Sequence, residues 1–389
     1  MTVQAVHCSD LHLDRSFNIP DPQRAAARRE DLNRNFVEIV DFAIHNHADL
    51  FLLAGDVFDR VRPSNDTAVL LTRKIRELKD HGIATFAIAG NHDIPKIGNY
   101  RHIALDTLSS AGLAQVFSRS DTIQTQTVQL DGQAVCISGK SYDARNEVGN
   151  PLKGQKVPLD GELNVLLLHA SLRGLSVNPS APEMAAQNPF FPDDVRRGLN
   201  YLALGHYHNF YEREHNGVKI CNPGSIERIT WAEMNETKGF AWVNIDRENT
   251  ALEFIQLRTR DMRKQELRLE SGQTGYLLNF VTAQLDGIAD PELILRLSLS
   301  GQITIEEYQK LQMTELYRRM RGSFFHLIID RVGLGIEGYG RVFLGRVDNP
   351  VEAFTKRLDV KMAMATTDDE RQRLTQIRDL GIAYLGEAA

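Results

Sequence analysis

The sequence has few of the features that mark secreted or membrane proteins. It contains three cysteines among 389 residues, far apart and without a Cys-x-x-Cys pair, so neither a disulfide framework nor a zinc ribbon is expected. Apolar runs such as residues 165–168 are far too short to cross a bilayer. The N-terminus shows no basic segment followed by an apolar stretch, so no secretory signal is expected. We therefore expect a cytoplasmic protein with no membrane partner.

A strongly basic character is also missing. The formal net charge is −6 at pH 7, from 45 lysines and arginines against 51 aspartates and glutamates. A chain of this charge does not attract nucleic acid through its overall field. If it binds nucleic acid, the contacts must come from local basic patches, from metal ions or from a partner.

The N-terminal part of the chain alternates strand and helix patterns. Apolar runs at residues 3–7, 49–54 and 83–89 predict buried strands, and apolar residues at helical spacing predict helices over about 23–47 and 65–81. Strands separated by helices of this length indicate βαβ units and a buried parallel sheet.

After about residue 128 the pattern changes mostly to strands, interrupted by a loop at 176–192 rich in Pro, Ala and Asn. The expected strands are 134–139, 164–169, 201–205, 219–221 and 240–245. Together with the N-terminal units they predict an α/β fold, a four-layer α/β/β/α sandwich of two facing sheets.

A basic, polar stretch at 258–264 looks like a domain boundary, because a chain of this length is expected to form two or three domains. Beyond it, strands at 266–269, 293–300 and 324–330 and helices within 277–286 and 305–320 predict a small α+β capping domain, followed by a glycine-rich connector at 333–345 and helical patterns at 349–364 and 368–385. We therefore expect a catalytic domain (1–260), a capping domain (261–345) and a helical tail (346–389) that either docks a partner or presents an ordinary solvated face.

Polar side chains directly follow apolar strands at five places. These are His7–His12, Gly55–Asp59, Gly90–Asp93, Leu168–Ala170 and Gly205–His208. In sheet-based α/β folds, ligands bind just beyond the carboxyl ends of the strands, where the loops converge. Aspartate, histidine and asparagine repeated there predict a metal-binding cup.

Two of these motifs place two donors at a spacing of two residues. In extended backbone, Asp10 and His12 would point to the same side and could chelate one ion together. His206 and His208 repeat the pattern and could divide their imidazoles between neighbouring ions. We also expect Gly55 to let the backbone turn sharply so that Asp56 can bridge two cations.

Gly90, like Gly55, is expected to allow a sharp backbone turn, here so that Asn91 and His92 can present their side chains. The donors then divide into two sets around a shared carboxylate: Asp10, His12, Asp56 and His208 for one ion, and Asp56, Asn91, His169 and His206 for the other. Oxygen and nitrogen donors without thiolate suit manganese, iron or zinc, and two such ions clamp a phosphate for in-line displacement. His92 is left over as a general acid.

Taken in order, the five motifs resemble the signature of calcineurin-like metallophosphoesterases. The amino-acid sequence in and around these motifs resembles that of the SbcD group of DNA-repair exonucleases. The similar segments are residues 7–13, 54–59, 90–95, 201–208, 222–228 and 238–240. The resemblance is strong over residues 3–245 and only architectural afterwards. It implies a manganese-dependent 3′–5′ exonuclease and endonuclease that acts as a homodimer on DNA, together with an SbcC-type ABC ATPase carrying a long coiled coil.

The chain also departs from the family pattern, and several residues have two interpretations. Asp59 occupies the position where some relatives have a second histidine. Residues 176–192 do not align with the sequence pattern of the family. Asp59 and Asp93 are expected to anchor loops or orient a ligand histidine. Arg60 and Arg62 follow the second motif and either contact DNA phosphates or face solvent. Residues 222–225 form either a tight turn or part of the site.

Two other functions fit the same residues. A phosphatase or phosphodiesterase acting on small molecules uses the same metal cup, although about 130 residues after the catalytic sandwich exceed what such an enzyme needs. A scaffold for the ATPase that only keeps the fold is the third possibility, and the complete donor set argues against it.

Overall fold

The structure is a computed structural model that describes residues 2–96, 102–174, 186–272, 276–337, 340–341, 354–355, 358–359, 361–362 and 367–387. The chain divides into two units. One comprises Met1–Arg263 with Glu292–Ile294, and the other comprises Lys264–Pro291 with Leu295–Ala389. In the described residues, no helix has both the length and the apolar character needed to span a membrane.

The first sheet of the larger unit runs in the order β12-β11-β1-β2-β3-β4. The strands are β1 (Val3–Cys8), β2 (Leu50–Ala54), β3 (Ala84–Ile88), β4 (Gln115–Phe117), β11 (Gly239–Ile245) and β12 (Ala251–Gln256). β1 to β4 are parallel, β11 pairs antiparallel to β1, and β12 pairs antiparallel to β11. Every residue of β2 is buried, as expected of a parallel strand covered on both faces.

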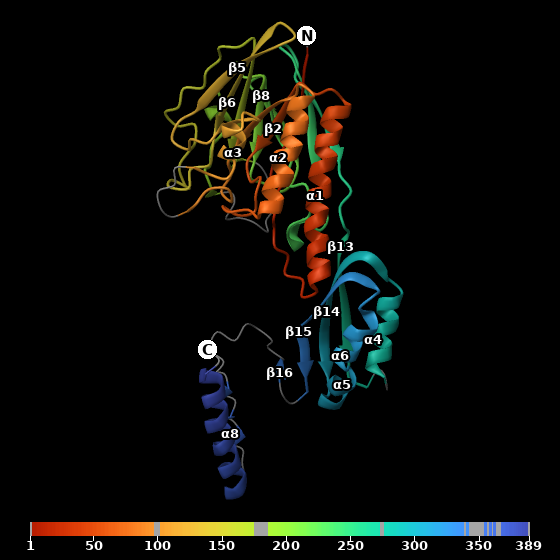
Figure 1. Ribbon diagram of the computed structural model, residues 1–389. Helices are drawn as coiled ribbons and strands as arrows, with labels where there is room; N and C mark the ends of the chain where they lie inside the picture. The colour runs from red at the N-terminus through yellow and green to blue at the C-terminus, as the bar shows by residue number, and fades with distance from the viewer. Residues whose placement is uncertain are drawn as a thin grey trace. The chain divides into compact units, whose positions relative to one another are not determined.

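Helices α1 (Pro22–His45) and α2 (Asn65–Asp80) lie side by side over the outer face of this sheet (Figure 1). Asp21 caps α1 by accepting hydrogen bonds from the backbone of Gln23 and Arg24, and Pro22 occupies the first turn, where its missing N–H costs nothing. The side chains predicted to face the core are all buried: Leu32, Phe36, Ile39, Val40 and Ala43. The short helix α3 (Asp106–Ser110) precedes β4.

The second sheet runs in the order β5-β6-β7-β8-β10-β9. Its strands are β5 (Gln124–Leu130), β6 (Gln133–Lys140), β7 (Leu163–His169), β8 (Tyr201–Gly205), β9 (Tyr211–His215) and β10 (Val218–Asn222). The four inner strands are parallel, and β5 and β9 pair antiparallel at the edges. Apolar side chains of both sheets, among them Leu52 and Leu167, form one core between them, which confirms the sandwich of two facing sheets.

Helices pack on the outer face of the first sheet, whereas loop residues pack on the outer face of the second. Among the described residues, its apolar side chains pack against loop residues such as Leu152, Val157 and Phe190, next to the short 3-10 helix η2 (Pro192–Asp194). Most of the loop predicted at 176–192 lies outside the described residues.

The smaller unit contains a four-stranded sheet in the order β13-β14-β15-β16. Its elements are β13 (Met262–Glu270), α4 (Leu277–Asp286), β14 (Asp290–Ile303), α5 (Ile305–Lys310), α6 (Met313–Met320), β15 (Phe324–Ile336), β16 (Gly340–Arg341) and α8 (Asp368–Glu387). The strands and α4 agree with the predicted α+β character of this region.

Two expectations for this unit were wrong in detail. The single helix expected at 305–320 is two helices, because Gln312 adopts a left-handed backbone with φ 44° that α-helix cannot continue through. The connector expected at 333–345 begins as strand, since β15 runs on to Ile336 and pairs with β16. Most of the helix predicted at 349–364 lies outside the described residues. The division into domains at 260 and 345 stays a prediction.

Candidate metal centre

The five polar motifs follow the carboxyl ends of β1, β2 and β3 in the first sheet and of β7 and β8 in the second. Because the two sheets face each other across a shared core, these ends meet at one edge of the sandwich. Backbone hydrogen bonds join the loops: the Asp10 N–H donates to the Gly55 carbonyl at 3.0 Å, and the His12 N–H donates to the Asp56 carbonyl at 3.0 Å. The His206 N–H, from the other sheet, donates to the Asp10 carboxylate at 3.0 Å.

The backbone at several donors is left-handed. The φ angles are 51° at Asp10, 45° at His12, 48° at Asp56 and 107° at His206. Side chains other than glycine rarely adopt this region, and proteins keep such strain mainly at functional sites. The expectation that the two spaced pairs lie in extended backbone was therefore wrong, because β1 ends at Cys8 and β8 ends before His206. The pairs converge through sharp turns.

Two glycines make room for these turns in different ways. Gly55 has φ 89° as expected, and a Cβ there would also collide with the His169 ring. Gly90 does not share the positive φ of Gly55. Instead, a Cβ at Gly90 would collide with the Asp56 carboxylate, so the position needs the absence of a side chain rather than an unusual backbone.

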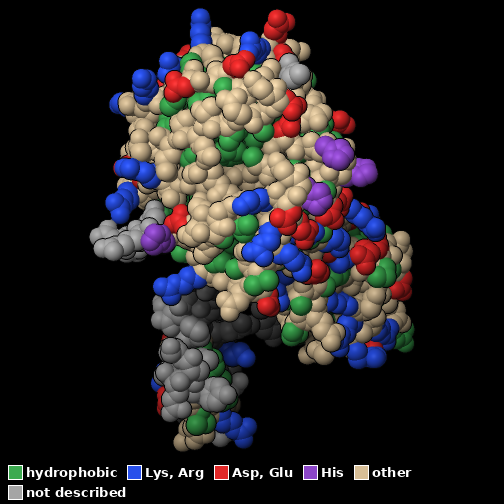
Figure 2. Space-filling view, turned by 45° about the horizontal axis from the view of Figure 1, so that its top comes forward, with side chains coloured by type: hydrophobic (Ala, Val, Ile, Leu, Met, Phe, Trp, Pro, Cys, Tyr) green, Lys and Arg blue, Asp and Glu red, His purple; other side chains and the backbone are tan. Residues whose placement is uncertain are grey.

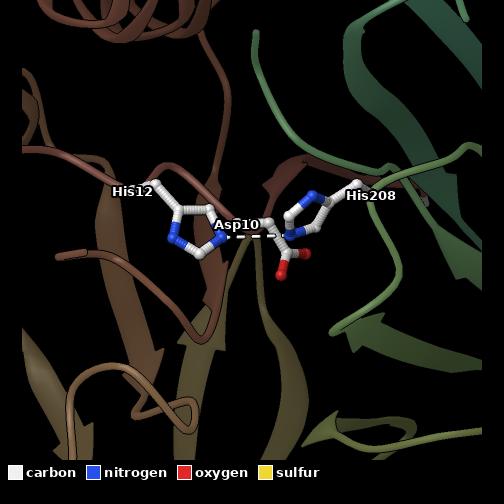
Figure 3. A group of neighbouring side chains, drawn as sticks. All are labelled: Asp10, His12 and His208. Carbon is white, nitrogen blue, oxygen red and sulfur yellow. Dashed lines mark hydrogen bonds between the residues drawn. The ribbon is translucent and has the colours of Figure 1, made fainter. Parts of the chain in front are cut away.

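Asp10, His12 and His208 form one group, with one ligand atom from each lying within 4.8 Å of the others. Figure 3 shows the two rings pointing toward each other beside the carboxylate, with Nε2 of His12 3.1 Å from Nε2 of His208. The segment after β1 supplies Asp10 and His12, and the segment after β8 supplies His208.

The hydrogen bonds behind these rings determine which nitrogens carry protons. His12 Nδ1 lies 3.1 Å from a carboxylate oxygen of Asp59, and His208 Nδ1 lies 3.0 Å from a carboxylate oxygen of Glu233. A carboxylate only accepts, so both Nδ1 atoms are donors. When the imidazoles are neutral, their Nε2 lone pairs therefore face each other in a partly buried space. This arrangement is repulsive unless a cation is present between them, so the residues fit a metal ion.

The remaining donors form a second group around Asp56. His169 Nε2 lies 3.4 Å from Asp56 Oδ2 and 3.1 Å from Asn91 Oδ1, and His206 Nδ1 lies 3.2 Å from the same Asn91 oxygen. His169 Nδ1 donates to the Ala54 carbonyl at 2.9 Å, so Nε2 is the nitrogen that faces Asp56 and Asn91. Since Asp56 Oδ2 also lies 3.8 Å from His12 Nε2, its carboxylate stands between the two groups.

His92 lies at the exposed side of the centre. Its backbone N–H donates to the Asp56 carboxylate at 2.8 Å, and its Nδ1 donates to the Asp59 carbonyl at 3.1 Å. Nε2 is thus the nitrogen left for other chemistry. Nitrogen and carboxylate atoms of His92, His12 and Asp56 also come within 4.8 Å of one another, but the side chain of His92 is 38% exposed whereas that of His12 is fully buried.

Burial and charge act together on the carboxylates. Burial alone would raise the pKa of Asp56, but His169 and His12 hold the pKa below its ordinary value, so the group is an anion. Burial, followed by repulsion from Asp56, raises the pKa of Asp93 to about 7. Asp93 accepts hydrogen bonds from the backbone N–H groups of Val57, Phe58 and Gly90, which is the loop-anchoring contact expected of it.

Three residues of the site carried no prediction. Tyr142 is buried and stacks on His206 with ring centroids 6.3 Å apart. It follows β6, so the rule that polar residues follow strands would have found it. Glu233 and Lys238 are buried behind His208 and ion-pair at 2.7 Å. In sequence, both lie far from the strand ends that form the cup. Only the similarity of the Lys-Gly-Phe segment to the family pattern pointed to Lys238.

The arginines predicted to contact DNA differ in their surroundings. Arg60 donates to the Asp14 carbonyl at 3.0 Å and to Ser16 at 2.7 Å, and is half-exposed, whereas Arg62 is exposed. Figure 2 shows basic and acidic side chains interspersed over the face in view, in keeping with the net charge of −6. A role of Arg60 and Arg62 in binding DNA stays a prediction.

A sandwich of two sheets with an acidic and histidine-rich cup at the strand ends is the architecture of a metal-dependent phosphoester hydrolase. The profile of the calcineurin-like phosphoesterases matches residues 4–210, that is 207 of 389 residues. The chain belongs to this family.

The chain is also similar to individual proteins at low sequence identity. The chain is 26% identical over 256 residues to the uncharacterized metallophosphoesterase YhaO of Bacillus subtilis, covering 64% of this chain and 59% of that protein. It is 23% identical over 313 residues to the DNA double-strand break repair protein Mre11 of Sulfolobus acidocaldarius, covering 78% of this chain and 77% of that protein. For Mre11 of Sulfurisphaera tokodaii the identity is 27%, over 67% of this chain and 64% of that protein.

Proposed function

We propose that the protein is a manganese-dependent phosphodiesterase that cleaves DNA, with exonuclease and endonuclease activity. The observation that carries the proposal is the convergence of His12 Nε2 and His208 Nε2, 3.1 Å apart, beside Asp10 and the central Asp56 carboxylate. Similarity to Mre11 repair proteins over as much as 78% of the chain supports DNA as the substrate.

The proposed ligand sets are those expected from the sequence. One ion is held by Asp10, His12, Asp56 and His208, and the other by Asp56, Asn91, His169 and His206. Two divalent ions bound there supply Lewis-acid polarisation of a phosphoryl group and activation of a water molecule. Nitrogen and oxygen donors without thiolate suit manganese.

His92 is the proposed general acid. Its Nδ1–H is committed to the Asp59 carbonyl, so Nε2 is the atom that can hold a proton toward a departing oxygen. The Asp59 carboxylate lies 3.9 Å from His92 Nδ1. The partial exposure of His92 lets a polymer reach it, while the buried donors remain out of contact with bulk water.

The proposal extends to partners. We propose a homodimer that works with an SbcC-type coiled-coil ATPase on DNA in the cytoplasm. Helix α8 exposes Ile377 and Leu380, at 50% and 73%, among charged residues. An exposed apolar pair on a charged helix fits docking against another helix.

The test is hydrolysis by the metal-free full chain after addition of manganese, with end-labelled duplex DNA, single-stranded DNA and bis(p-nitrophenyl) phosphate as substrates. We expect cleavage of DNA that chelation abolishes and that the Asp56→Asn variant lacks. Cleavage of the small ester but of neither DNA would favour the small-molecule phosphodiesterase. Failure to cleave any of the three would refute the proposal.

A further inference from the structure

Glu233 lies behind the metal centre, at the end of the short 3-10 helix η3 (Trp231–Glu233) and outside all five motifs. Its side chain is 4% exposed, and one carboxylate oxygen accepts the Nδ1–H of His208 at 3.0 Å. A buried carboxylate in contact with the far nitrogen of a metal-ligand histidine determines which nitrogen faces the metal.

The Glu233 carboxylate is itself held from several sides. Oε2 lies 2.7 Å from the Lys238 Nζ and accepts from the Ser225 hydroxyl at 3.2 Å and the Ile229 N–H at 3.1 Å. Oε1, which faces His208, also accepts from the Thr230 N–H at 3.0 Å. Burial alone would raise the pKa of Glu233, but His208 and Lys238 keep it far below the ordinary value, so the group stays ionised.

The same segment also holds the main chain of His208. The Lys238 Nζ, whose side chain is fully buried, donates to the His208 carbonyl at 2.7 Å. The Ser225 N–H donates to that carbonyl at 3.0 Å, and Asn222 donates to the Tyr207 carbonyl at 2.7 Å. Both the backbone position and the ring orientation of His208 are therefore fixed by residues 222–238, so the turn at 222–225 serves the site.

We infer that Glu233 is a positioning residue for the ion held by Asp10, His12 and His208. The inference rests on the metal site of the proposed function. Both imidazoles of this group have carboxylates behind them, Asp59 for His12 and Glu233 for His208. A carboxylate behind the ring fixes its orientation and increases the basicity of the ligand nitrogen.

The second ion site lacks this support at His169, whose Nδ1 donates to the neutral carbonyl of Ala54. The ion beside His208 is therefore the one that depends on Glu233. Removing the charge of Glu233 weakens that ion about 10–100-fold and leaves the other nearly unchanged.

The test is calorimetric titration of manganese into the metal-free full chain, comparing wild type with Glu233→Gln. Glu236→Gln is the matched control, because Glu236 also ion-pairs with Lys238 at 2.7 Å, whereas the His208 ring bonds to Glu233. We expect two binding events in wild type and in Glu236→Gln. In Glu233→Gln one event is weaker by about 10–100-fold. Nitrogen NMR of the metal-free protein should show the His208 Nδ1–H signal shifted or lost in that variant alone.

Two manganese ions bound by a folded Glu233→Gln variant with wild-type affinities would overturn the inference. If Glu233→Gln does not fold, Glu233→Asp replaces it, because the shorter side chain keeps the charge beside Lys238 but withdraws from Nδ1. The same loss of affinity is expected, and wild-type affinity would again overturn the inference. A wild-type protein that binds no manganese would instead refute the proposed metal site.

Discussion

Asp59 serves several side chains of the centre at once. Its carboxylate lies 3.1 Å from His12 Nδ1 and 2.6 Å from Arg15, and its carbonyl accepts from His92. Burial alone would raise the pKa of Asp59, but His12 and Arg15 lower it. A position where some relatives carry histidine thus becomes, in this chain, a support for one proposed ligand and for the proposed general acid.

Replacement of His92 separates proton transfer from metal binding. We expect His92→Ala to lower the rate of DNA cleavage by about 10²–10⁴-fold, because a general acid contributes that much. Manganese affinity should change little, since the side chain of His92 is 38% exposed and lies outside the proposed ligand sets. Titration calorimetry and cleavage assays measure the two effects. Parallel loss of metal affinity would identify His92 as a ligand instead.

Substitution of Gly55 and Gly82 can separate backbone strain at positive φ from steric collision of the added Cβ. Both have positive φ, 89° and 81°, but a Cβ at Gly82 meets no atom within 4 Å whereas one at Gly55 enters the His169 ring. Gly82→Ala should cost about 1–2 kcal/mol of unfolding free energy and leave manganese binding intact. Gly55→Ala should cost more and weaken manganese binding, as measured by denaturation and calorimetry. Equal behaviour of the two variants would contradict the steric argument.

At the scale of single residues, the identity of the donors could be predicted but not their backbone. Residue types and spacing identified Asp10, His12 and His208, which the structure brings together. The left-handed φ angles of Asp10 and His12 could not be predicted, because the strain at these positions is imposed by contacts with loops distant in sequence. Glu233 was missed for the same reason, since nothing near it in sequence indicates that His208 lies beside it.

Among the elements, α1 is connected to the segment after β10 by buried charges. Arg28, with a side chain 1% exposed, lies 2.7 Å from Glu227 and 3.2 Å from Asp31, and Asn35 donates to the Ile226 carbonyl at 2.8 Å. These contacts tie the helix to the segment that continues into Glu233.

Removing only Arg28 from its ion pair with Glu227 should lower the free energy of unfolding. Arg28→Met leaves the buried Glu227 carboxylate uncompensated and should reduce the unfolding free energy by about 3–5 kcal/mol. Adding Glu227→Gln removes that charge, so the double variant should recover part of the loss. Urea denaturation measures both variants. A double variant no more stable than Arg28→Met would show that Glu227 is not the source of the cost.

A histidine on β1 should make the core sensitive to acid. His7 is fully buried with its Nδ1 2.8 Å from the Tyr201 hydroxyl, and burial lowers its pKa to about 3. Between that value and the ordinary 6.5 the unfolded chain binds the proton and the folded chain does not. Stability is therefore fully present above pH 6.5 and is lost as the pH falls, by up to about 1.4 kcal/mol per pH unit.

The variant His7→Asn lacks this titration. Its unfolding free energy, followed between pH 7 and pH 4, should fall less steeply than that of wild type by about 1 kcal/mol per pH unit. The difference between the two proteins, rather than either slope, reports on His7, because other groups titrate in both. Parallel slopes would mean that His7 accepts its proton in the folded state.

Elements with a strong apolar period were predictable and those set by tertiary contacts were not. The buried face of α1 agrees with the prediction because its apolar residues repeat at helical spacing over several turns. The break at Gln312 carries no proline or glycine signal, and β15 runs through two glycines that usually mark loops. Packing against neighbouring strands overrides the local preference in both places.

At the scale of the whole molecule, the metals should stabilise one unit only. All proposed ligands lie within Met1–Arg263. Manganese at 100 times the dissociation constant of one site adds about 2.7 kcal/mol to the stability of the protein for that site. In a unit of this size that corresponds to a rise in melting temperature of about 5–10 °C. The transition of the smaller unit should not move.

Differential scanning calorimetry with and without chelator measures this difference. Asp56→Asn serves as the control, because it removes the carboxylate placed between the two groups of donors. A shift of the same size in Asp56→Asn, or one shared by both units, would show that manganese stabilises the chain elsewhere.

The strand order of the first sheet also determines when the centre can form during synthesis. β11, made from Gly239–Ile245, pairs with β1 near the middle of that sheet, and His206 and His208 leave the ribosome long after Asp10 and His12. A nascent chain that has emerged only as far as β3 therefore presents three of the seven proposed ligands, Asp10, His12 and Asp56, on an incomplete sheet. We therefore expect metal capture to be a late event of biogenesis, after translation has passed residue 245, and a truncated translation product to lose the ions.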